Sequence, residues 1–475
     1  MKLFPVTALA LALATAFPAQ AQSNADILKE LQALKAKVTE LEGKLKAQEA
    51  KLPPAAGQWG MTPDQARELN RATMKAEASE DAMESQGLKL LTISGFMDPT
   101  YIYNQRQNRS GFQFLNPVSL GGYNYDNSYF GGAYLDLQKE MEGGTKWRLT
   151  IVPNRGTGSV IGDASIVQEA SVSIPLGDLQ TRIIAGQMPD WSGYEYQQAT
   201  LNKLITHNLL YDFTLPTLYT GVGMEYTRGK WWTRWMLANV NTSTRNAGER
   251  APAFVYRVDY SRGEFQGFGF AGLHGKGANF RSDDLNPFTG DAYRTADTRL
   301  DLFEVDAYFI RGDWTVQGQL SLGRHRGAAI APDPNTGALR DARWEGLSGL
   351  VAYKITPRLE VITRADHVRN SKNGGGLLGY TGYWDPANGV LGETRSGLGV
   401  DATLDCVTDP TVSDCNRGAN RTALSFGMGW LDYLNTTFKV EYRLDHADRR
   451  VFLVAKDGSY KKTNHLLGAS VLVAW

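Results

Sequence analysis

From position 88 to the C-terminus, most segments of the chain alternate between apolar and polar residues with a period of two. In "NTTFKVEYRLDHAD", Phe438 and Val440 fall on one side of an extended strand, and Lys439 and Glu441 fall on the other. This alternation is typical of a β-strand with one apolar and one polar face. A sheet packed on a soluble core alternates in the same way. What decides the fold is therefore what covers the apolar faces.

The alternation predicts about sixteen strands. Most are about ten residues long, which is the length that a tilted strand needs to cross a bilayer. They run approximately over Leu91–Tyr103, Tyr129–Glu140, Thr145–Ile151, Ser165–Ile174, Leu179–Met188, Leu218–Thr227, Trp231–Asn239, Ala253–Ser261, Phe265–His274, Arg299–Ile310, Trp314–Leu322, Arg343–Lys354, Leu359–Val368, Arg421–Leu431, Thr436–Asp445 and His465–Trp475.

The connectors between these segments alternate between short and long without exception. The short ones are turns such as "MEGG", "RGK" and "RGD". The long ones cover 104–128, 152–164, 189–217, 240–252, 275–298, 323–342, 369–420 and 446–464. Short turns at one end, long loops at the other and an even number of strands are typical of an outer-membrane barrel. We therefore predict an all-β transmembrane barrel of about 16 antiparallel strands over residues 89–475.

The C-terminal stretch "HLLGASVLVAW" is predicted to close this barrel. Leu467, Val471 and Val473 form its lipid-facing row, and Trp475 lies at the level of an aromatic girdle. The last strand must pair with the first, because an open edge in lipid leaves backbone groups unpaired. Outer-membrane barrels generally end on an aromatic residue that the barrel-insertion machinery reads, so this machinery is an expected partner, beside the lipid bilayer and lipopolysaccharide.

The N-terminus is typical of an exported protein. Lys2 precedes the apolar run "LFPVTALALALATAF", and Ala19 to Ala21 form an A-x-A cleavage site. A membrane anchor would need a run of about 20 apolar residues. We therefore predict a signal peptide over 1–21 and residence in the outer membrane of a Gram-negative cell, with the N-terminal segment in the periplasm.

Residues 24–52 carry a heptad pattern. The apolar positions form two sets: Leu31, Val38, Leu45 and Leu52, and Ile27, Leu34 and Leu41. The remaining positions are rich in Lys and Glu, as in a coiled coil. We predict a periplasmic α-helical coiled coil over 22–52 and, since a coiled coil implies an oligomer, a homotrimer. A single amphipathic helix lying on another surface is the alternative.

The segment 53–88 is predicted to be a linker with a possible short helix. "PPAAGQWG" interrupts the preceding helical pattern. Thr62 is suited to cap a helix, and Pro63 is suited to its first position. The apolar face of this helix is weak, so a loosely ordered linker is the alternative.

The two cysteines, Cys406 and Cys415, lie in a stretch rich in Gly, Asp and Thr. Export to an oxidising compartment predicts a local disulfide. A metal site would need His or further Cys beside them, so neither a metal nor a cofactor is expected. The chain has 50 basic and 50 acidic residues, and this balance offers no argument for a nucleic-acid partner.

The predicted strands place charged residues on the enclosed face of the barrel. A polar interior within sixteen strands is wide enough for an aqueous channel. Alternatively, these charges pair across neighbouring strands and only solvate a wall. The candidate pore-lining residues are Arg148, Arg182, Glu225, Asp259, Glu304, Asp306, Arg364 and Arg443.

Several segments resemble a proteobacterial exported, porin-like family known only as a domain of unknown function. They include "ISGFMDPTYIYN", "GQMPDWSGYEY", "LITHNLLYDFTLP" and "MEYTRGKW". The resemblance covers most of the mature chain. A coiled coil ahead of sixteen strands is also similar in architecture to the phosphate-selective porins, but no arginine ladder is evident, so phosphate selectivity is not carried over.

The third long connector, 189–217, is unusually apolar for a loop in water, and exposing its leucines together would be costly. The third loop of general porins folds into the lumen. By this similarity we expect the connector to narrow the channel, with Asp190, Glu195 and Asp212 facing the arginines on the wall. Packing over the rim or against a neighbouring subunit is the alternative.

The resemblance implies a porin for the passive diffusion of small polar solutes. A structural or adhesive barrel is the alternative. The six histidines, which include His207 and His274, lie in no recognisable catalytic motif, so enzymatic activity is not expected. The sequence does not reveal the solute.

Overall fold

A computed structural model describes residues 62–85, 88–115, 131–153, 166–240, 252–279, 281, 284–294, 297–378, 383–385, 390–392, 399–404, 413–432 and 435–475, with a few residues between 35 and 44. The chain divides into two units, Met1–Lys89 and Leu90–Trp475, and each is described by itself.

In the first unit, helix α3 spans Pro63–Ser85. Thr62 Oγ1 accepts a hydrogen bond from Gln65 N, at 3.3 Å, and Gln65 Oε1 accepts one from Thr62 N, at 3.0 Å. These two bonds form a capping box, which pairs backbone donors that the first turn leaves free. The helix is long because no Gly or Pro follows Pro63 within it.

The predicted signal peptide and most of the predicted coiled coil lie outside the described residues. The described residues between 35 and 44 are helical. The coiled coil over 22–52 therefore stays a prediction. Among the described residues, no helix has the length and apolar character needed to span a membrane.

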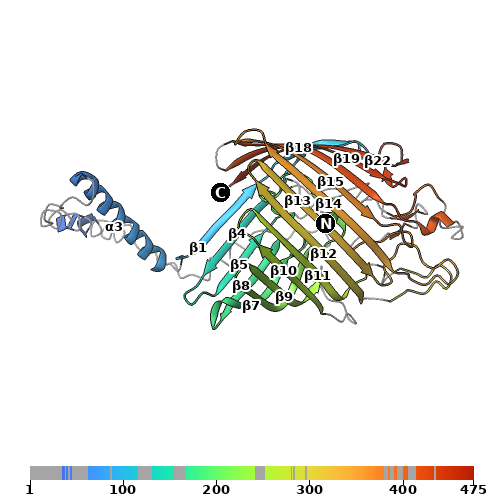
Figure 1. Ribbon diagram of the computed structural model, residues 1–475, viewed down its shortest axis with the longest axis horizontal. Coiled ribbons are helices and arrows are strands. Elements are labelled where there is room, and N and C mark those ends of the chain that lie inside the picture. Colours follow the sequence, from blue (N-terminus) through green and yellow to red (C-terminus); the bar gives the residue numbers. More distant parts are fainter. Residues whose placement is uncertain are drawn as a thin grey trace, which may run out of the picture. The chain divides into compact units, whose positions relative to one another are not determined.

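The second unit is a closed antiparallel barrel (Figure 1). Among the described residues, its sheet contains eighteen strands. Of these, β1 and β2 are two halves of the first wall strand, and β3 is paired with β2 alone, so the wall has sixteen. The bounds are β1 Leu91–Met97, β2 Thr100–Asn104, β3 Arg109–Gln113, β4 Ala133–Glu140, β5 Lys146–Ile151, β6 Val167–Leu176, β7 Asp178–Pro189, β8 Leu218–Arg228, β9 Trp231–Val240, β10 Ala253–Ser261, β11 Gln266–Ala278, β12 Asp297–Arg311, β13 Trp314–His325, β14 Ala342–Lys354, β15 Leu359–Arg369, β18 Arg421–Asp432, β19 Thr436–Ala447 and β22 Thr463–Ala474.

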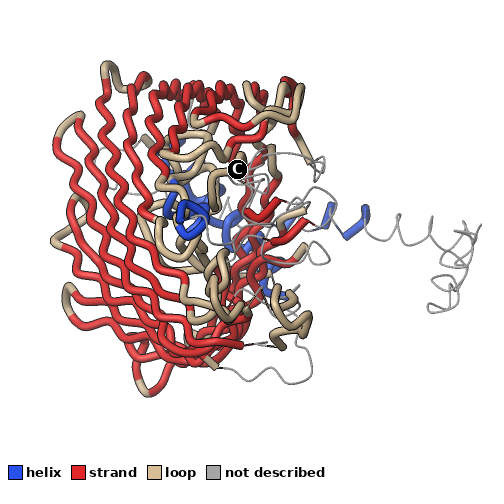
Figure 2. Tube along the Cα trace, turned by 90° about the vertical axis from the view of Figure 1, so that its right-hand side faces the viewer, coloured by secondary structure: helices blue, strands red, loops and turns tan. Residues whose placement is uncertain are grey.

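The predicted strand number and the alternation of short and long connectors are both confirmed. Each wall strand pairs with the next along the chain through a short turn or a long loop, and Figures 1 and 2 show this tilted wall from two sides. The first strand is interrupted between its two halves at Pro99, which has no N–H to give to the ladder. The described parts of the long loops contain two small hairpins, a 3-10 turn and a short helix: β16 Tyr383–Asp385 with β17 Val390–Gly392, β20 Phe452–Leu453 with β21 Tyr460–Lys461, η1 Ser413–Asn416, and α4 Leu209–Phe213.

The last residue takes part in closing the barrel. β22 pairs with both halves of the first strand, with Ala474 opposite Phe96 and Ser470 opposite Thr100. Trp475 exchanges two backbone hydrogen bonds with Gly95, at 3.0 and 3.1 Å. A Cβ on Gly95 would lie 2.5 Å from the Trp475 ring, so the indole can pack there only over a glycine. The sheet therefore has no free edge at this seam.

The outer face of the wall is apolar, and aromatic residues gather near the short turns. Trp231 follows the turn after β8, and its ring lies 4.8 Å from that of Tyr260. Trp314 follows the turn after β12, and its ring lies 4.6 Å from that of Tyr353. Such an aromatic belt marks the level of a membrane interface.

Candidate functional site in the barrel interior

Residues 190–217 connect β7 to β8, and they pack against the enclosed face of the wall. Asn208 caps α4 by accepting a hydrogen bond from Tyr211 N at 2.8 Å. Leu209, Leu210 and Phe213 are 0, 0 and 1% exposed, and they pack with apolar residues that face inward from β12, β14 and β18. The apolar residues that set this connector apart in the sequence are therefore buried inside the barrel.

Inward-facing glycines on the wall make room for this loop. A Cβ on Gly427 of β18 would lie 2.3 Å from a methyl carbon of Leu204, and one on Gly346 of β14 would lie 2.9 Å from Leu210 Cγ. Contacts this short do not occur for real Cβ atoms. The loop and the wall thus approach each other as closely as glycine allows.

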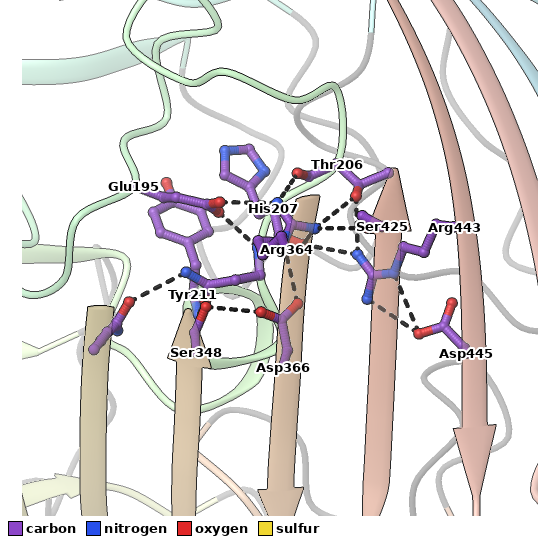
Figure 3. A network of polar contacts seen from close by, with 12 residues as sticks. Glu195, Thr206, His207, Tyr211, Ser348, Arg364, Asp366, Ser425, Arg443 and Asp445 are labelled. Carbon is purple, nitrogen blue, oxygen red and sulfur yellow. Dashed lines mark hydrogen bonds and ion pairs between the residues drawn. The ribbon is translucent and has the colours of Figure 1, made fainter. Parts of the chain in front are cut away.

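Two arginines of the wall bind the loop backbone (Figure 3). Arg364 on β15 donates to Glu195 Oε1 at 2.8 Å, to Thr206 O at 2.6 Å and to His207 O at 2.8 Å. Arg443 on β19 donates to His207 O at 2.7 Å and to Thr206 Oγ1 at 3.1 Å. Both side chains are 0% exposed. Their guanidinium groups are therefore enclosed between the loop and the wall.

Carboxylates complete this cluster from both sides. Glu441 on β19 accepts hydrogen bonds from Ile205 N at 2.8 Å and from Thr206 N at 2.7 Å. Glu195 on the loop accepts one from Asn208 N at 2.6 Å. Burial raises the pKa of the Glu195 carboxyl, and the positive charge of Arg364 opposes that rise. The buried arginines thus have acidic partners in direct contact, as buried charges require.

Lysines hold the middle of the loop to the same side of the wall. Lys203 Nζ lies 2.6 Å from an oxygen of Glu360 on β15. Lys439 on β19 donates to two loop carbonyls, those of Ala199 at 2.7 Å and Asn202 at 2.6 Å. On the other side, the side chains of Gln198 and Tyr134 on β4 form a hydrogen bond at 2.6 Å, and Asp190 accepts one from the Tyr219 hydroxyl on β8 at 2.5 Å.

The inner faces of β4 to β9 border an open cavity of about 390 Å³. Some charged side chains on this wall remain accessible although their partners are buried: Arg148 is 33% exposed and lies 2.8 Å from Asp136 and 3.4 Å from Glu169, whose side chains are 3% and 10% exposed. Lys146 lies 3.2 Å from Glu140, and both side chains are more than 40% exposed. The cavity lining includes Gln138, Glu140, Lys146, Arg148, Glu169, Ser171, Ser173, Glu225 and Arg234.

The predicted pore-lining residues divide into three groups. Arg148 and Glu225 border the cavity, and Arg182 lies 3.4 Å from Glu225. Arg364 and Arg443 do not border it, which corrects the expectation from the sequence, because Thr206 and His207 fill the space in front of them.

The other three predicted wall carboxylates lie near the start of the loop. Arg257 lies 2.7 Å from Asp259 and 2.7 Å from Asp306, and it also donates to Trp191 O at 2.7 Å. Glu304 is 0% exposed. These carboxylates therefore belong to the region of the wall against which the loop packs.

The predicted acidic residues of the loop do not face the arginines across a gap. Glu195 contacts Arg364 directly. Asp190 accepts hydrogen bonds from Ser192 N at 3.0 Å and from the Tyr219 hydroxyl at 2.5 Å. Asp212 is 8% exposed within α4. The expected arrangement is therefore wrong in this respect, since the loop is in contact with the wall that carries Arg364.

Several interior residues were not singled out from the sequence. Arg421 on β18 is 0% exposed, lies 2.9 Å from Asp445, and has its guanidinium 5.1 Å from the centre of the Phe213 ring. The alternation of side chains along β18 places Arg421 on the inward face, and this alternation is visible in the sequence. The partners of Thr206 depend on the loop conformation, for which the sequence carries no local signal.

Cys415 lies in η1, is 4% exposed and packs with Val400. Cys406 lies outside the described residues. The predicted disulfide between Cys406 and Cys415 therefore stays a prediction.

The apolar outer face, the charged inner face and the closed strand order define a transmembrane β-barrel of the outer-membrane type with a loop packed inside it. The family model described as "Protein of unknown function (DUF3138)" matches residues 2–475, and the chain belongs to this family.

Solved structures of similar fold include the outer membrane channel DcaP of Acinetobacter baumannii, with 11% identity and a TM-score of 0.49 over 81% of this chain and 97% of that one. Another is an anion-selective porin from Comamonas acidovorans, with 10% identity and a TM-score of 0.46 over 81% and 99%. OmpT of Vibrio cholerae in its trimer form matches with 9% identity and a TM-score of 0.47 over 81% and 99%. The comparison with curated proteins found no match.

Proposed function

We propose that this protein is an outer-membrane porin, a water-filled channel for the passive diffusion of small polar solutes. The observation that supports this most is the cavity of about 390 Å³, bordered by charged and polar side chains within a wall that is apolar outside. A barrel that serves only as a structural or adhesive anchor gains nothing from charged side chains kept accessible in its interior.

In this proposal, residues 190–217 form the constriction. The loop is held to β15 by the ion pairs of Glu195 with Arg364 and of Lys203 with Glu360, and to β4 by the hydrogen bond between Gln198 and Tyr134. Solutes would therefore pass between the loop and the inner faces of β4 to β9. The lining there carries both signs of charge, which fits permeation by small polar solutes of several kinds.

The assembly proposed around this channel is a homotrimer held by a parallel coiled coil of residues 24–52 in the periplasm. Deleting that segment should weaken the oligomer and leave the barrel inserted, and native mass spectrometry of both forms tests this. A monomeric full-length protein would contradict it.

Trp475 is proposed to be read by the insertion machinery, and basic side chains exposed at the long-loop end, such as Arg343, are proposed to contact lipopolysaccharide.

The experiment that tests the channel is conductance of the purified, folded protein in planar lipid bilayers. We expect discrete, ohmic conductance steps in KCl, because an aqueous path conducts in proportion to voltage. The control is the same preparation after heat unfolding, which should give no steps. A folded, inserted protein without conductance would reject the porin and favour the structural barrel.

A further inference from the structure

Arg234 projects from the middle of β9 into the cavity described above. Its neighbours across the sheet are Glu225 on β8 and Arg257 on β10. Both neighbours have partners of their own. Glu225 lies 3.4 Å from Arg182, and Arg257 lies 2.7 Å from Asp306. The side chains closest to Arg234 in the sheet therefore already form ion pairs with other residues.

The other arginines on this part of the inner wall are all in ion pairs. Arg148 pairs with Asp136, Arg182 with Glu225, and Arg257 with Asp259 and Asp306. Within the described part of the chain, the guanidinium of Arg234 has no ion pair or hydrogen bond, and its Nε is buried without a partner. A guanidinium that is partly removed from water and lacks an acceptor raises the free energy of the folded protein.

Two indoles hold the plane of this guanidinium. The Arg234 Cζ atom lies 4.5 Å from the centre of the Trp191 ring and 4.4 Å from that of Trp232. Trp191 is itself held, since its carbonyl accepts a hydrogen bond from Arg257 at 2.7 Å and its ring meets Tyr219 edge to face at 5.2 Å. Stacking covers the faces of a guanidinium and leaves the N–H donors in its plane available for an acceptor.

We propose that Arg234, held between Trp191 and Trp232, is a binding site for small organic monocarboxylates within the channel. A carboxylate matches the planar fork of donors in a guanidinium. A single negative charge suits this place, because the carboxylates of Glu225 and Asp259 lie nearby and would repel a dianion. The rigid stack lowers the entropic cost of binding. This inference deepens the proposed function and rests on it.

Binding can be measured apart from transport. Saturation-transfer NMR with acetate on the folded protein in detergent should give a signal for the wild type and lose most of it in Arg234→Gln. Arg343→Gln changes the charge of the protein by the same amount at an exposed position outside the cavity and should keep the signal. Heat-modifiable migration on gels checks that both variants are folded. Equal signals in wild type and Arg234→Gln would overturn the inference, and so would equal losses in both variants.

Permeation gives the second readout. The permeability ratio of acetate to potassium, taken from the reversal potential in a potassium acetate gradient, should fall about three- to tenfold in Arg234→Gln. Arg234→Lys keeps the positive charge but lacks the planar fork of donors, so its permeability ratio should lie between those of the wild type and Arg234→Gln. If hydrogen phosphate binds more tightly than acetate, the carboxylate assignment is wrong. Absence of conductance in the wild type rejects the proposed porin, whereas conductance with an unchanged ratio rejects only this inference.

Discussion

The inner wall of the barrel has two sides that are built from the same kinds of residue and behave differently. On the side of β15 and β19, Arg364 and Arg443 are 0% exposed beneath the loop. On the side of β4 to β9, Arg148 is 33% exposed and borders open space. Both sides arise from strands that alternate apolar and charged residues. The difference lies in the loop 190–217, which buries Arg364 and Arg443 and leaves Arg148 next to open space.

The comparison shows that an inward charge can have two physical roles. Under the loop, Arg364 meets acceptors from the loop and from the wall, and each contact replaces the water that burial removed. On the open side, a pair of exposed side chains such as Lys146 and Glu140 is solvated by water and contributes little to stability. Removing the same type of charge from the two sides should therefore have unequal effects.

The largest contrast is expected between Arg364→Met and Lys146→Met. Each removes one inward cation. Losing Arg364 leaves Glu195, Asp366 and Glu441 without their shared partner in a buried cluster, and should lower the free energy of unfolding by about 3–5 kcal/mol. Losing Lys146 breaks a pair that is half exposed, and should cost less than about 1 kcal/mol.

Urea titration of the barrel in lipid vesicles, followed by tryptophan fluorescence, measures both changes. Arg364→Met should unfold at a much lower urea concentration than the wild type, and Lys146→Met close to it. Similar midpoints for the two variants would mean that water reaches Arg364 as freely as Lys146, and the distinction between the two sides would fail.

Accessibility of the two sides can be compared with matched serines. Ser171 borders the cavity, whereas Ser348 is 1% exposed and lies 2.6 Å from the Tyr194 hydroxyl. In a protein whose native cysteines are replaced by serine, Ser171→Cys should react with a charged thiosulfonate reagent at least about tenfold faster than Ser348→Cys, because the reagent needs a water-filled path. Mass spectrometry of timed samples measures the rates. Rapid labelling at position 348 would show that the loop leaves that side open.

Deleting residues 197–210 should make the two sides alike. The deletion removes Lys203, Thr206 and the residues just before and at the start of α4. These residues cover β15 and β19, so water should reach Arg364 and Arg443 once they are gone. We expect the single-channel conductance to rise about two- to fourfold, since a sixteen-strand barrel without an inner loop is wide. Deleting 456–458, at the exposed tip between β20 and β21, is the control and should leave conductance unchanged. An unchanged conductance in the folded deletion of 197–210 would place the constriction elsewhere.

The wall could be predicted from the sequence because period-two alternation is a local property. The predicted strand Ala253–Ser261 coincides with β10, and the parity of charges in β19 placed Glu441 and Arg443 on the enclosed face. The break of the first strand was missed, although Pro99 was a visible signal for it.

The cover over Arg364 could not be predicted, because it depends on where the Thr206 hydroxyl and the His207 carbonyl lie after the loop has folded. Parity says which way a side chain points and not what it meets. One signal was available and unused: the inward glycines Gly346 and Gly427, where a loop packs against the wall. The stack of Trp191 on Arg234 joins residues from a loop and a strand, and it has no sequence signature.

The smallest effect concerns a pair outside the barrel wall, where solvation is greatest. Arg449 donates to both oxygens of Asp414, at 3.1 Å each, and joins η1 to the loop after β19. These hydrogen bonds hold the pKa of Asp414 below its usual range. A lowered carboxyl pKa adds stability above the ordinary value near 3.8, and this contribution is lost as the pH falls through the lowered value. Hydrogen exchange of the peptide around residue 414 should therefore be slower in the wild type than in Asp414→Asn at pH 6, and this difference should shrink as the pH is lowered below 3.8. A difference that does not shrink would mean that the ion pair does not hold η1, and that the open, solvated parts of this protein depend on contacts other than charge.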